Sequence, residues 1–361
     1  MKILIYLDSI TPAGGIERVV AKHISFFAKK HNVTLLTKDS DESFYKLPQN
    51  IERVSLHINN HMNMQNRFHR ILQTIKQLWQ TRKKLKAYKE SHDLFYVAHI
   101  RNLLELYLSG IDMSKVVVTE HGSYYGYNIA YKLFKRWLYP KCKYVISPTT
   151  MDYKIYETHH CNAIYIPNPL SFYNENRADL NKKTVLNIGR FTNDKQQILL
   201  LDIWREVSKK HPKWELLLVG KGELEQLLLT KIHKYGLEKT VKIVKPTKNI
   251  ESLFLNSSIF AFTSKYEGFG MVLAEAMSCG VPCISFDIPS GPRDIIDNSV
   301  DGFLIRNGDI SDYITKLELL ITDTELRTTM GQKAKNNIQK FLDTKIEKQW
   351  DNLLEHGKPK L

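Results

Sequence analysis

Two glutamates stand eight residues apart in the segment 267–282, which reads EGFGMVLAEAMSCGVP. Glu267 begins a loop that also contains Gly268 and Gly270, and Glu275 falls inside the apolar run that follows. The glycines let the backbone come close to a ligand, and the run after them has helix-forming composition. Because the first amides of a helix are unpaired and its dipole is positive there, such a loop favours an anion. Two carboxylates beside an anion site predict a ligand with both phosphate and hydroxyl groups, such as a sugar nucleotide.

Two cations follow another apolar run. Arg190 and Lys195 come after the residues TVLNIG at 184–189. A guanidinium fork and an ammonium group suit a diphosphate, whose growing charge must be stabilised as a glycosidic bond breaks. Any arbitrary Arg and Lys on a loop would be solvated, so the motifs around them decide the interpretation.

The elements that must position these residues alternate along the whole chain. Short apolar runs that read as buried strands are separated by amphipathic helical stretches. Continuous apolar strands between helices indicate parallel sheets covered on both faces, and this chain length predicts two doubly wound α/β domains. The prolines of IPNPL at 166–170 interrupt the pattern and mark the predicted division. The expected strands include ILIYL (3–7), VTLLT (33–37), LFYVA (94–98), VVVTE (116–120), YVISP (144–148), TVLNIG (184–189), ELLLVG (215–220), VKIV (241–244), IFAFT (259–263) and PCISF (282–286).

The composition is that of an ordinary globular protein, 43% hydrophobic and 25% charged over 361 residues. The N-terminal run MKILIYLDSI lacks a long apolar region and a cleavage site, so no signal peptide is expected. No apolar stretch approaches the ~20 residues needed to span a bilayer. The four cysteines include no Cys-x-x-Cys pair, so we expect reduced, structural thiols in the cytoplasm.

Positive charge gathers in the N-terminal half. The formal net charge is +14, from 52 Lys plus Arg and 38 Asp plus Glu. Residues 1–170 hold 24 of these cations and 13 of these acids, a balance of +11, and the rest of the chain holds 28 against 25, a balance of +3. This asymmetry predicts an anionic partner for the N-terminal half, either nucleic acid or the anionic leaflet of a membrane.

The segment 66–90 is strongly basic and is expected to form a helix. It contains eight Lys or Arg and one acid, and its apolar residues recur at three- and four-residue spacings. An apolar stripe with a basic opposite face can lie on an anionic membrane. The same stripe can instead pack on the N-terminal sheet with the charges solvated, and both can hold together. The candidate membrane or acceptor contacts are Arg67, Arg70, Lys76, Arg82, Lys83, Lys84 and Lys86.

Two loops of the N-terminal half also follow expected strands. The first, at 11–18, contains Gly15 and links the first strand to a helix. The second begins at Glu120 and His121. A His at the carboxyl end of a strand can hydrogen-bond a sugar hydroxyl or move a proton, although most lone histidines are structural or solvated.

Three of these segments together resemble a known family. The segment 267–282, NIGRFTNDK at 187–195 and GGIERVV at 14–20 are similar to motifs of the retaining glycosyltransferases of family 4. The Glu-x7-Glu pair of that family is matched here by Glu267 and Glu275, and the resemblance covers nearly the whole chain in the order and spacing of motifs. It implies the GT-B architecture, in which two doubly wound Rossmann-like α/β domains face each other across a cleft. The implied parts are an acceptor-side N-terminal domain (1–167), a nucleotide-sugar-binding C-terminal domain (168–340) and a C-terminal helix (341–361) that crosses back to the N-terminal domain.

The resemblance also implies roles for the candidate residues. Arg190 and Lys195 would grip the donor diphosphate, and Glu275 would accept hydrogen bonds from the ribose hydroxyls. Glu267 would lie by the sugar and shape the transition state, since retaining enzymes of this fold have no settled nucleophile. His121 would lie in the active site. The expected catalytic residues are thus Glu267 and His121, and the expected donor-binding residues are Gly15, Arg190, Lys195, Gly268, Phe269, Gly270, Met271 and Glu275.

Three features depart from the family's pattern or compete with it. Pro246 follows VKIV where relatives often have glycine, which leaves the contacts to the base open. Arg293 stands in a Gly-Pro-rich loop where an acidic residue is common, and its role is open. The tripeptide 39–41 matches the Asp-x-Asp metal motif of the other main glycosyltransferase fold, but we interpret it as a solvated acidic turn. No His or Cys spacing in the sequence indicates a structural metal.

The sequence therefore predicts a retaining, metal-independent glycosyltransferase with no cofactor. It would move a hexose or N-acetylhexosamine from a UDP-sugar to a polyprenyl-diphosphate-linked saccharide at the inner face of the cell membrane. Capsule, O-antigen or a related surface polysaccharide would be the product, and a lipopolysaccharide-core or protein acceptor is the alternative. A non-catalytic nucleic-acid-binding protein is a remote alternative, because it predicts aromatic residues interleaved with the cations and leaves Glu267 and Lys195 without a purpose.

Overall fold

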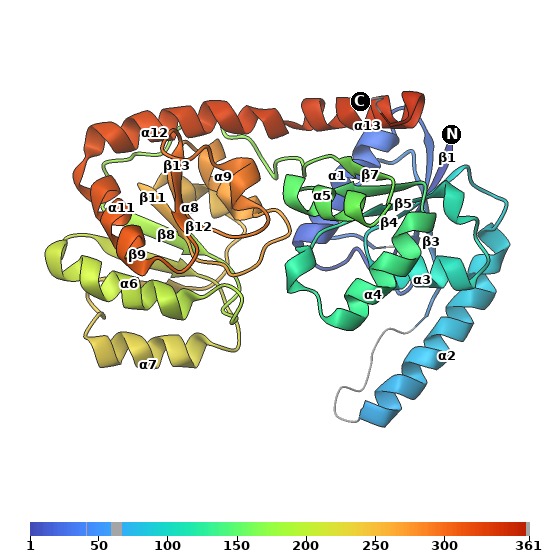
Figure 1. Cartoon of the computed structure of the whole chain (residues 1–361), viewed down its shortest axis with the longest axis horizontal. Helices are drawn as coiled ribbons and strands as arrows, with labels where there is room; N and C mark the ends of the chain where they lie inside the picture. The colour runs from blue at the N-terminus through green and yellow to red at the C-terminus, as the bar shows by residue number, and fades with distance from the viewer. Residues whose placement is uncertain (41, 59–66, 359–361) are drawn as a thin grey trace. The chain divides into compact units, whose positions relative to one another are not determined.

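The computed structural model describes residues 1–40, 42–58 and 67–358, apart from the side chains of 67–72, 74 and 75. The chain divides into two compact units, which Figure 1 follows by colour along the sequence. Unit 1 contains Met1–Pro169 together with the C-terminal residues from Ile346 onward, and unit 2 contains Leu170–Lys345. The first unit is thus built from both ends of the chain.

Unit 1 is built on a parallel sheet. In the described part of the chain its strands are β1 (Lys2–Leu7), β2 (Asn32–Thr37), β3 (Glu52–Ser55), β4 (Leu94–Val97), β5 (Val116–Thr119), β6 (Tyr144–Ser147) and β7 (Ala163–Tyr165). Their order is β3-β2-β1-β4-β5-β6-β7. The chain runs outward from β1 to β3 and then returns to pair β4 on the other side of β1. The carboxyl ends of β1 and β4 therefore form a switch point, where open α/β sheets bind ligands.

The helices of unit 1 cover this sheet on both faces, as the nearly continuous burial of its central strands requires. They are α1 (Gly15–Phe27), α2 (Arg67–Leu85), α3 (Ile100–Leu108), α4 (Ile129–Leu138), α5 (Thr150–Thr158) and α13 (Asp343–His356), with short 3-10 turns at η1 (Lys86–Tyr88), η2 (Met113–Lys115), η3 (Tyr124–Gly126) and η4 (Tyr139–Lys141).

Helix α13 completes the core of unit 1 from the far end of the sequence. The ring of Trp350 is fully buried, 4.9 Å from the ring of His23 and 5.2 Å from that of Phe27. Salt bridges from Lys29 to Glu347 (2.7 Å) and from Lys30 to the same helix lie at the rim of this contact. Since exposed ion pairs contribute little, the aromatic burial holds the helix in place.

Unit 2, all of whose residues are described, is a second parallel sheet. Its strands are β8 (Thr184–Ile188), β9 (Glu215–Val219), β10 (Val241–Val244), β11 (Ile259–Phe262), β12 (Cys283–Asp287) and β13 (Gly302–Arg306). Their order is β10-β9-β8-β11-β12-β13, so the switch point lies between β8 and β11. The helices are α6 (Gln197–Lys210), α7 (Glu225–Tyr235), α8 (Ile250–Leu255), α9 (Met271–Ser278), α10 (Pro292–Ile295), α11 (Ile310–Thr322), α12 (Thr324–Asn337) and the 3-10 turn η5 (Ile338–Phe341).

The predicted α/β class with two doubly wound parallel sheets is confirmed. Every apolar run that was expected to be a strand contributes to one. The polar edge strand β3, the short strand β7 and β13 were not among those expectations. The four cysteines are buried and free, as expected of structural thiols.

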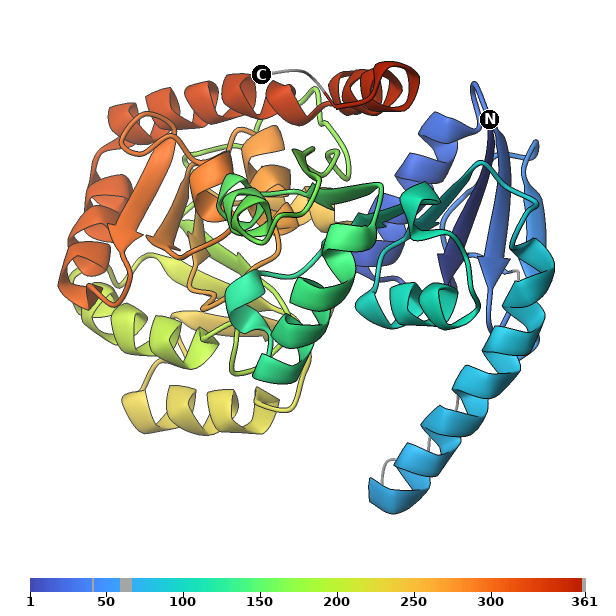
Figure 2. The same ribbon diagram turned by 45° about the vertical axis from the view of Figure 1, so that its right-hand side comes forward.

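The basic segment forms the predicted helix, α2, and its contact with the rest of unit 1 is partly polar. In the described part of the helix, the buried face contains Gln77 and Thr81 as well as Leu85, whereas Trp79 is 65% exposed. Figure 2 shows α2 running along the edge of unit 1 beside α3. The three- and four-residue spacing of apolar residues identifies a face of this helix, but not the depth at which each residue of that face lies.

Candidate active site

Lys195 and Glu267 meet at the switch point of unit 2. The ammonium Nζ of Lys195, on the loop after β8, lies 2.5 Å from Oε1 of Glu267, on the loop after β11. Both side chains are mostly buried, with exposed fractions of 19% and 14%. The structure therefore brings together two residues that are 72 positions apart in the sequence and that were predicted to act on the same donor.

Backbone constraints hold Lys195 in this position. The next residue, Gln196, has a positive φ of 53°, a left-handed conformation that costs a non-glycine residue free energy. The hydroxyl of Thr263 donates to the carbonyl oxygens of Lys195 (3.0 Å) and Gln196 (3.3 Å), and the amide of Lys265 donates to the carbonyl of Asp194 (2.7 Å). The end of β11 thus fixes the loop after β8, and an observed strain of this kind is typical of a functional site.

The glycine-rich loop turns sharply into α9, as predicted. Gly270 has a φ of 94° and caps the helix, so only glycine fits there without strain. Its neighbour Phe269 is 3% exposed, with its ring 5.2 Å from that of Phe341. The side chain of Phe269 therefore belongs to the core, and only its backbone can face a ligand. A side chain at Gly291 would come within 2.5 Å of the Phe269 carbonyl oxygen, which explains the glycine there.

Glu275 and Arg190 lie in contrasting environments. Glu275 is in the middle of α9 and only 2% exposed. Arg190 is exposed, and its guanidinium has no hydrogen-bond or ion-pair partner among the residues that the structure describes. The carbonyl oxygen of Arg190 accepts hydrogen bonds from the backbone amide of Thr192 (3.0 Å) and the side-chain amide of Gln197 (3.1 Å). Arg190 is thus available to an anionic ligand, whereas Glu275 offers a ligand only a small edge of its carboxylate.

A pocket of unit 2, of about 200 Å³, opens beside Arg190 at the ends of β8, β9 and β10. Two glycines shape it, because a side chain at Gly220 would lie 2.0 Å from the carbonyl oxygen of Gly189, and one at Gly222 would lie 2.4 Å from that of Phe191. Sequence reasoning missed these glycines, although their Gly-x-Gly spacing after an expected strand was a usable signal. The pocket is lined by Ile188, Gly189, Arg190, Val219, Gly220, Lys221, Pro246, Thr247, Ile250 and Leu253.

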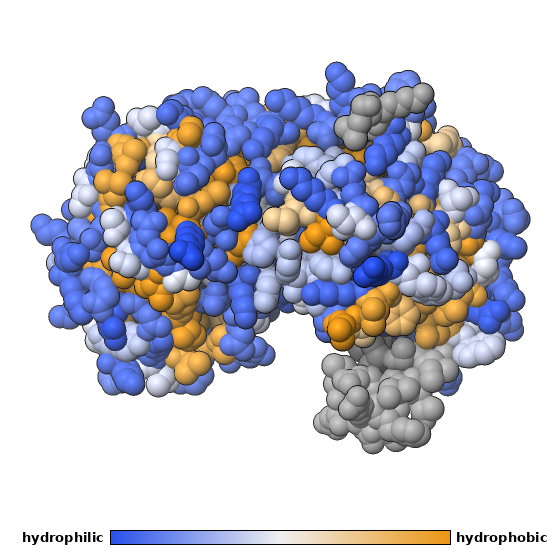
Figure 3. All heavy atoms as spheres, in the orientation of Figure 1, coloured by the Kyte–Doolittle hydropathy of each residue, from blue (hydrophilic) through white to orange (hydrophobic). Residues whose placement is uncertain are grey.

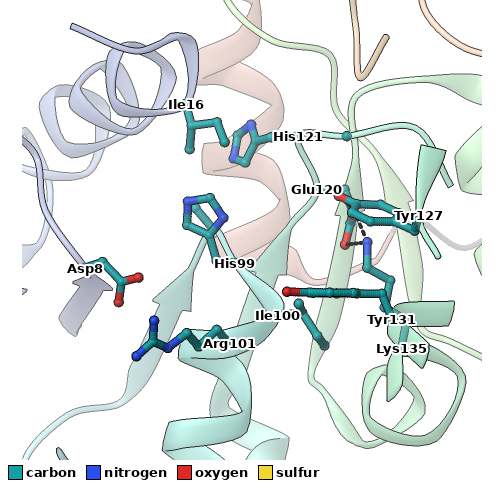
Figure 4. Close-up of a pocket in the computed structure, with 12 residues that line it drawn as sticks. Asp8, Ile16, His99, Ile100, Arg101, Glu120, His121, Tyr127, Tyr131 and Lys135 are labelled. Atoms are coloured by element: carbon teal, nitrogen blue, oxygen red, sulfur yellow. Dashed lines mark hydrogen bonds and ion pairs between the residues drawn. The ribbon is translucent and has the colours of Figure 1, made fainter. Parts of the chain in front are cut away.

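Unit 1 has its own pocket, of about 430 Å³, at its switch point (Figure 4). Side chains that follow β1, β4 and β5 converge on it, and α4 supplies one wall. Figure 4 shows the imidazoles of His99 and His121 turned toward the same space, with Asp8 and Arg101 on one side. The lining residues are Asp8, Ile16, Ala98, His99, Ile100, Arg101, Glu120, His121, Gly122, Tyr127, Tyr131 and Lys135.

His121 is a neutral imidazole in this pocket. Burial lowers its pKa to about 3, and the charges of His99 and Lys135 act in the same direction. Its Nε2 lies 3.0 Å from the hydroxyl of Thr119 at the end of β5. At neutral pH the side chain can therefore donate or accept one further hydrogen bond in the pocket, but it is a weak base in the free protein.

A buried chain of hydrogen bonds joins His121 to the C-terminal helix. Trp350 Nε1 donates to Nε2 of His23 (3.2 Å), and an indole nitrogen can only donate. Burial lowers the pKa of His23 to about 3, so the ring is neutral and its Nδ1 carries the proton, which it donates to the Tyr96 hydroxyl (2.9 Å). That hydroxyl lies 3.0 Å from the hydroxyl of Thr119, the partner of His121.

A buried ion pair underlies the other wall of the pocket. Lys135 of α4 donates to both carboxylate oxygens of Glu120, at 2.8 and 2.7 Å, and both side chains are nearly inaccessible. The hydroxyls of Tyr127 and Tyr139 donate to the same carboxylate. Sequence reasoning did not single out Lys135. Only the tertiary fold shows that this cation has a buried partner.

On another side of the pocket, the carboxylate of Asp8 forms an ion pair with Lys38. Burial would raise the pKa of Asp8, but the buried ammonium of Lys38, 2.5 Å away, outweighs it and lowers that pKa. Lys38 is shared with Glu105, which lies 2.6 Å from it. Asp8 is therefore a carboxylate at neutral pH, and it faces the same space as the two imidazoles.

Gly15 lies beside this region as the first residue of α1. A side chain built there would meet nothing within 4 Å, whereas one at Gly14 would lie 1.9 Å from the carboxylate of Glu17. The obstacle at Gly14 is the end of the flexible Glu17 side chain, which can move, so packing within the described residues requires a glycine at neither position.

The basic residues of α2 are mostly exposed. Arg82 stacks over the ring of Trp79, 5.4 Å from its centre, and Lys84 donates to the carbonyl oxygen of Leu56, so these two have structural contacts. Lys76, Lys83 and Lys86 are exposed. The side chains of Arg67 and Arg70, also predicted as contacts, lie outside the described residues.

Three further expectations concern charge and metal. Arg293 forms a bidentate ion pair with Asp287, so the guanidinium has a partner at the end of β12. Within the described residues there is no group of three His, Cys, Asp or Glu placed to hold a metal ion. Asp39 accepts from the amide of Ser40 in the predicted turn, and residue 41 lies outside the described residues.

The comparisons with known proteins agree with this geometry. Residues 13–171 match the family model described as Glycosyltransferase Family 4, and residues 172–337 match that described as Glycosyl transferases group 1. The amylovoran biosynthesis glycosyltransferase AmsD of Erwinia amylovora is 31% identical over 98% of this chain and 99% of its own. The chain belongs to the glycosyltransferases of family 4.

Two other similar proteins add detail on acceptor and fold. A Campylobacter jejuni enzyme, the alpha-1,4-N-acetyl-D-galactosaminyltransferase for GalNAc-alpha-(1->4)-GalNAc-alpha-(1->3)-diNAcBac-PP-undecaprenol, is 25% identical over 98% of both chains. A crystal structure of TarM from S. aureus in complex with UDP superimposes with a TM-score of 0.81 over 98% of this chain and 99% of that one, at 16% identity. The chain therefore has the GT-B fold of two Rossmann-like domains.

Proposed function

We propose that this protein is a retaining, metal-independent glycosyltransferase that moves a hexose or N-acetylhexosamine from a UDP-sugar to a polyprenyl-diphosphate-linked saccharide. The observation that carries the proposal is the cluster at the switch point of unit 2, where Lys195 and Glu267 meet and the exposed Arg190 lies on the same loop as Lys195. Family membership supports the reaction class. The donor, the stereochemistry and the acceptor are what the proposal adds.

On the donor side, the cations would act on the leaving diphosphate. As the bond between the sugar and the phosphate breaks, negative charge grows on the phosphate oxygens, and Lys195 and Arg190 would stabilise it. Because Glu267 holds the Lys195 ammonium at 2.5 Å, it fixes the cation before the donor arrives. The amide groups of 268–271, at the start of α9, would bind the phosphates, and the edge of Glu275 would accept from the ribose hydroxyls.

On the acceptor side, the pocket of unit 1 offers polar groups suited to a saccharide. Neutral His121 can hydrogen-bond a sugar hydroxyl without placing a charge beside it. Asp8 offers a carboxylate that accepts from hydroxyls, and the aromatic rings of Tyr127 and Tyr131 provide apolar surface for sugar faces. The proton of the attacking hydroxyl would pass to the leaving phosphate, so no enzyme base has to accept it permanently.

The lipid-linked acceptor is supported by two independent observations. The Campylobacter jejuni relative is named for a saccharide on diphospho-undecaprenol, and it matches this chain over nearly its whole length. The N-terminal half also carries most of the net positive charge, with Lys76 and Lys83 exposed on α2 and Lys86 exposed at the start of η1. Such a surface attracts both an acceptor diphosphate and the anionic inner leaflet of the cell membrane. We place the protein at that leaflet as a peripheral enzyme of surface polysaccharide synthesis.

The proposal is tested by measuring binding and hydrolysis of a panel of UDP-, GDP- and ADP-sugars in the presence of EDTA. We expect turnover of one UDP-sugar that EDTA does not change and that Lys195→Ala and Glu275→Ala abolish. Retention of anomeric configuration is then read by NMR of the product formed on an undecaprenyl-diphosphate-linked saccharide. Turnover that requires a divalent metal, or that uses only a GDP- or ADP-sugar, would contradict the donor and metal parts of the proposal.

A further inference from the structure

Helix α4 buries one face and exposes an apolar one. Among its residues only Lys135 and Leu138 are fully buried, and the pocket-lining Tyr131 lies near them on the helix. On the other side of the helix, apolar side chains face outward with large exposed fractions. These are Ile129 (77%), Leu133 (62%), Phe134 (46%) and Trp137 (46%).

This surface is continuous and unusual for a helix of a soluble domain. At about 100° per residue, Ile129, Leu133 and Trp137 follow one another along a single stripe of the helix, and Phe134 borders it. Leu108, at the end of the neighbouring α3, is 41% exposed, and the Tyr107 ring lies 5.1 Å from that of Trp137. Figure 3 shows hydrophobic residues gathered along this edge of unit 1. A contiguous exposed apolar patch of this kind marks an interaction surface.

The charges around the patch have one sign. Between His121 and Met151 the sequence contains five Lys or Arg and no Asp or Glu. One of the five, Lys135, is neutralised by Glu120 in the interior. Two of the others lie at the stripe, since Arg136 is exposed beside it and the Lys141 ammonium is 5.8 Å from the centre of the Trp137 ring. Apolar side chains with a tryptophan and flanking cations are typical of a helix that lies in the interface of an anionic membrane.

We infer that the exposed face of α4 inserts into the interface of an anionic phospholipid bilayer and docks unit 1 on it. A second copy of this chain fits the face poorly, because it would bring the same unopposed cations together. The surface differs from α2, where polar Gln77 and Thr81 lie on the buried side and the exposed side is mainly charged. On this inference α2 attracts the membrane electrostatically, and α4 supplies the apolar contact.

The placement has a consequence for the acceptor, which rests on the proposed function. Tyr131 and Lys135 of the same helix line the pocket of unit 1. A helix that lies in the bilayer interface on one side and lines the saccharide pocket on the other would hold that pocket at the membrane surface. The saccharide of a polyprenyl-linked acceptor could then enter while its lipid stays in the bilayer.

The test is sedimentation of the full-length protein with phosphatidylcholine vesicles that contain either no anionic lipid or about 30% phosphatidylglycerol. We expect binding to the anionic vesicles and a loss of affinity of at least about tenfold for Ile129→Gln/Leu133→Gln. Both side chains are exposed, so the substitution leaves the core intact. The matched control is Leu227→Gln/Leu229→Gln on α7, where the same residue type is 51% and 45% exposed in unit 2, and we expect it to bind like the wild type.

A second variant tests the electrostatic contribution to vesicle binding, and a second readout tests whether Trp137 inserts into the bilayer. Arg136→Gln/Lys141→Gln should weaken binding to anionic vesicles only, and more so at low salt. Brominated lipids should quench Trp137 fluorescence in a Trp79→Phe background. Unchanged binding of the α4 variants, absence of vesicle binding, or a dimer that Ile129→Gln/Leu133→Gln dissociates would each overturn the inference. No nucleotide sugar is present in these experiments, so failure of the proposed transfer reaction would leave their outcome unaffected.

Discussion

Lys195 and Glu267 come from different loops and depend on each other for position, since each is mostly buried and lies 2.5 Å from the other. Because burial costs both charges much of their hydration, their attraction is largely offset and the ion pair adds little net stability. The pair holds a cation at the expected diphosphate site. We therefore expect it to matter for the rate of the reaction more than for the stability of the fold.

Glu267→Gln should therefore slow turnover without unfolding the protein. The amide keeps the size of the side chain but removes the charge that fixes the Lys195 ammonium. We expect kcat for donor hydrolysis to fall on the order of 100-fold, as when one preorganised group is lost from an active site. The free energy of unfolding, measured with urea, should fall by only about 1–3 kcal/mol, because the amide still fills the space but leaves the Lys195 ammonium without its counter-charge.

The matched control for this prediction is Glu215→Gln. Glu215 forms an ion pair of the same length with Lys242 on the surface of unit 2, away from the switch point. We expect it to leave turnover unchanged. Equal losses in the two variants would mean that the charge of Glu267 has no special place in the reaction.

His121→Phe should affect the acceptor and spare the donor. The imidazole lies in the pocket of unit 1, whereas the proposed diphosphate site lies in unit 2. We expect transfer to the saccharide to fall about 100-fold, since a positioned hydrogen-bonding group is lost. Hydrolysis of the donor by water, measured in parallel, should change by less than about threefold. A parallel loss of both reactions would place His121 in the donor site instead.

At the scale of secondary-structure elements, Trp350 ties α13 to the core of unit 1 through an indole hydrogen bond and the burial of its ring. Trp350→Phe keeps an aromatic ring there but removes the N–H that His23 accepts. Because a buried acceptor is left unpaired, we expect unit 1 to lose about 1–3 kcal/mol of unfolding free energy. Hydrogen exchange of amides in α1 and β4 would report the loss.

The control for this substitution lies in unit 2. Trp204 is also fully buried, and its Nε1 donates to the hydroxyl of Thr240 at 3.3 Å. Trp204→Phe should raise hydrogen exchange in α6 and β8 and leave α1 and β4 protected. If Trp350→Phe and Trp204→Phe gave the same pattern of exchange, the two units would not unfold separately.

The elements also show what the sequence could predict. Continuous apolar strands and the glycine loop before α9 are local signals, so the two sheets and the approach of Lys195 toward Glu267 followed from the position of each loop at a strand end. The pairing of Glu120 with Lys135 and the buried Gln77 and Thr81 were not predictable in this way. In each case a residue distant in the sequence either pairs with the polar side chain or shields it from solvent.

At the scale of the whole molecule, stability should fall in mild acid. His23 has a pKa of about 3 in the folded protein, because burial, together with the charges of His121 and Lys22, disfavours its protonation. In the unfolded chain the pKa is near 6.5. As the pH falls below 6.5, the unfolded state gains a proton that the folded state does not. Folding stability is therefore lost between about pH 6.5 and pH 3, and is unaffected by this group above that window.

The expected size is about 2 kcal/mol of unfolding free energy lost to His23 between pH 7 and pH 5. Urea denaturation at both values measures it. In His23→Gln the difference between the two pH values should be smaller than in the wild type by about that amount. An equal difference in both proteins would show that His23 titrates normally in the folded state.

Unit 1 draws its last helix from the end of the chain, and this has a consequence for synthesis. While the ribosome is still translating unit 2, the slot formed by His23, Phe27 and Tyr96 has no occupant, because Trp350 has not yet been made. Domains commonly fold in order as they emerge, but here the first domain cannot complete its core until the last has been translated. The nascent first domain would spend that interval with aromatic surface open to chaperones. A stop codon that removes only α13 should therefore reduce the yield of folded protein, although unit 2 and its strand-end loops would be intact.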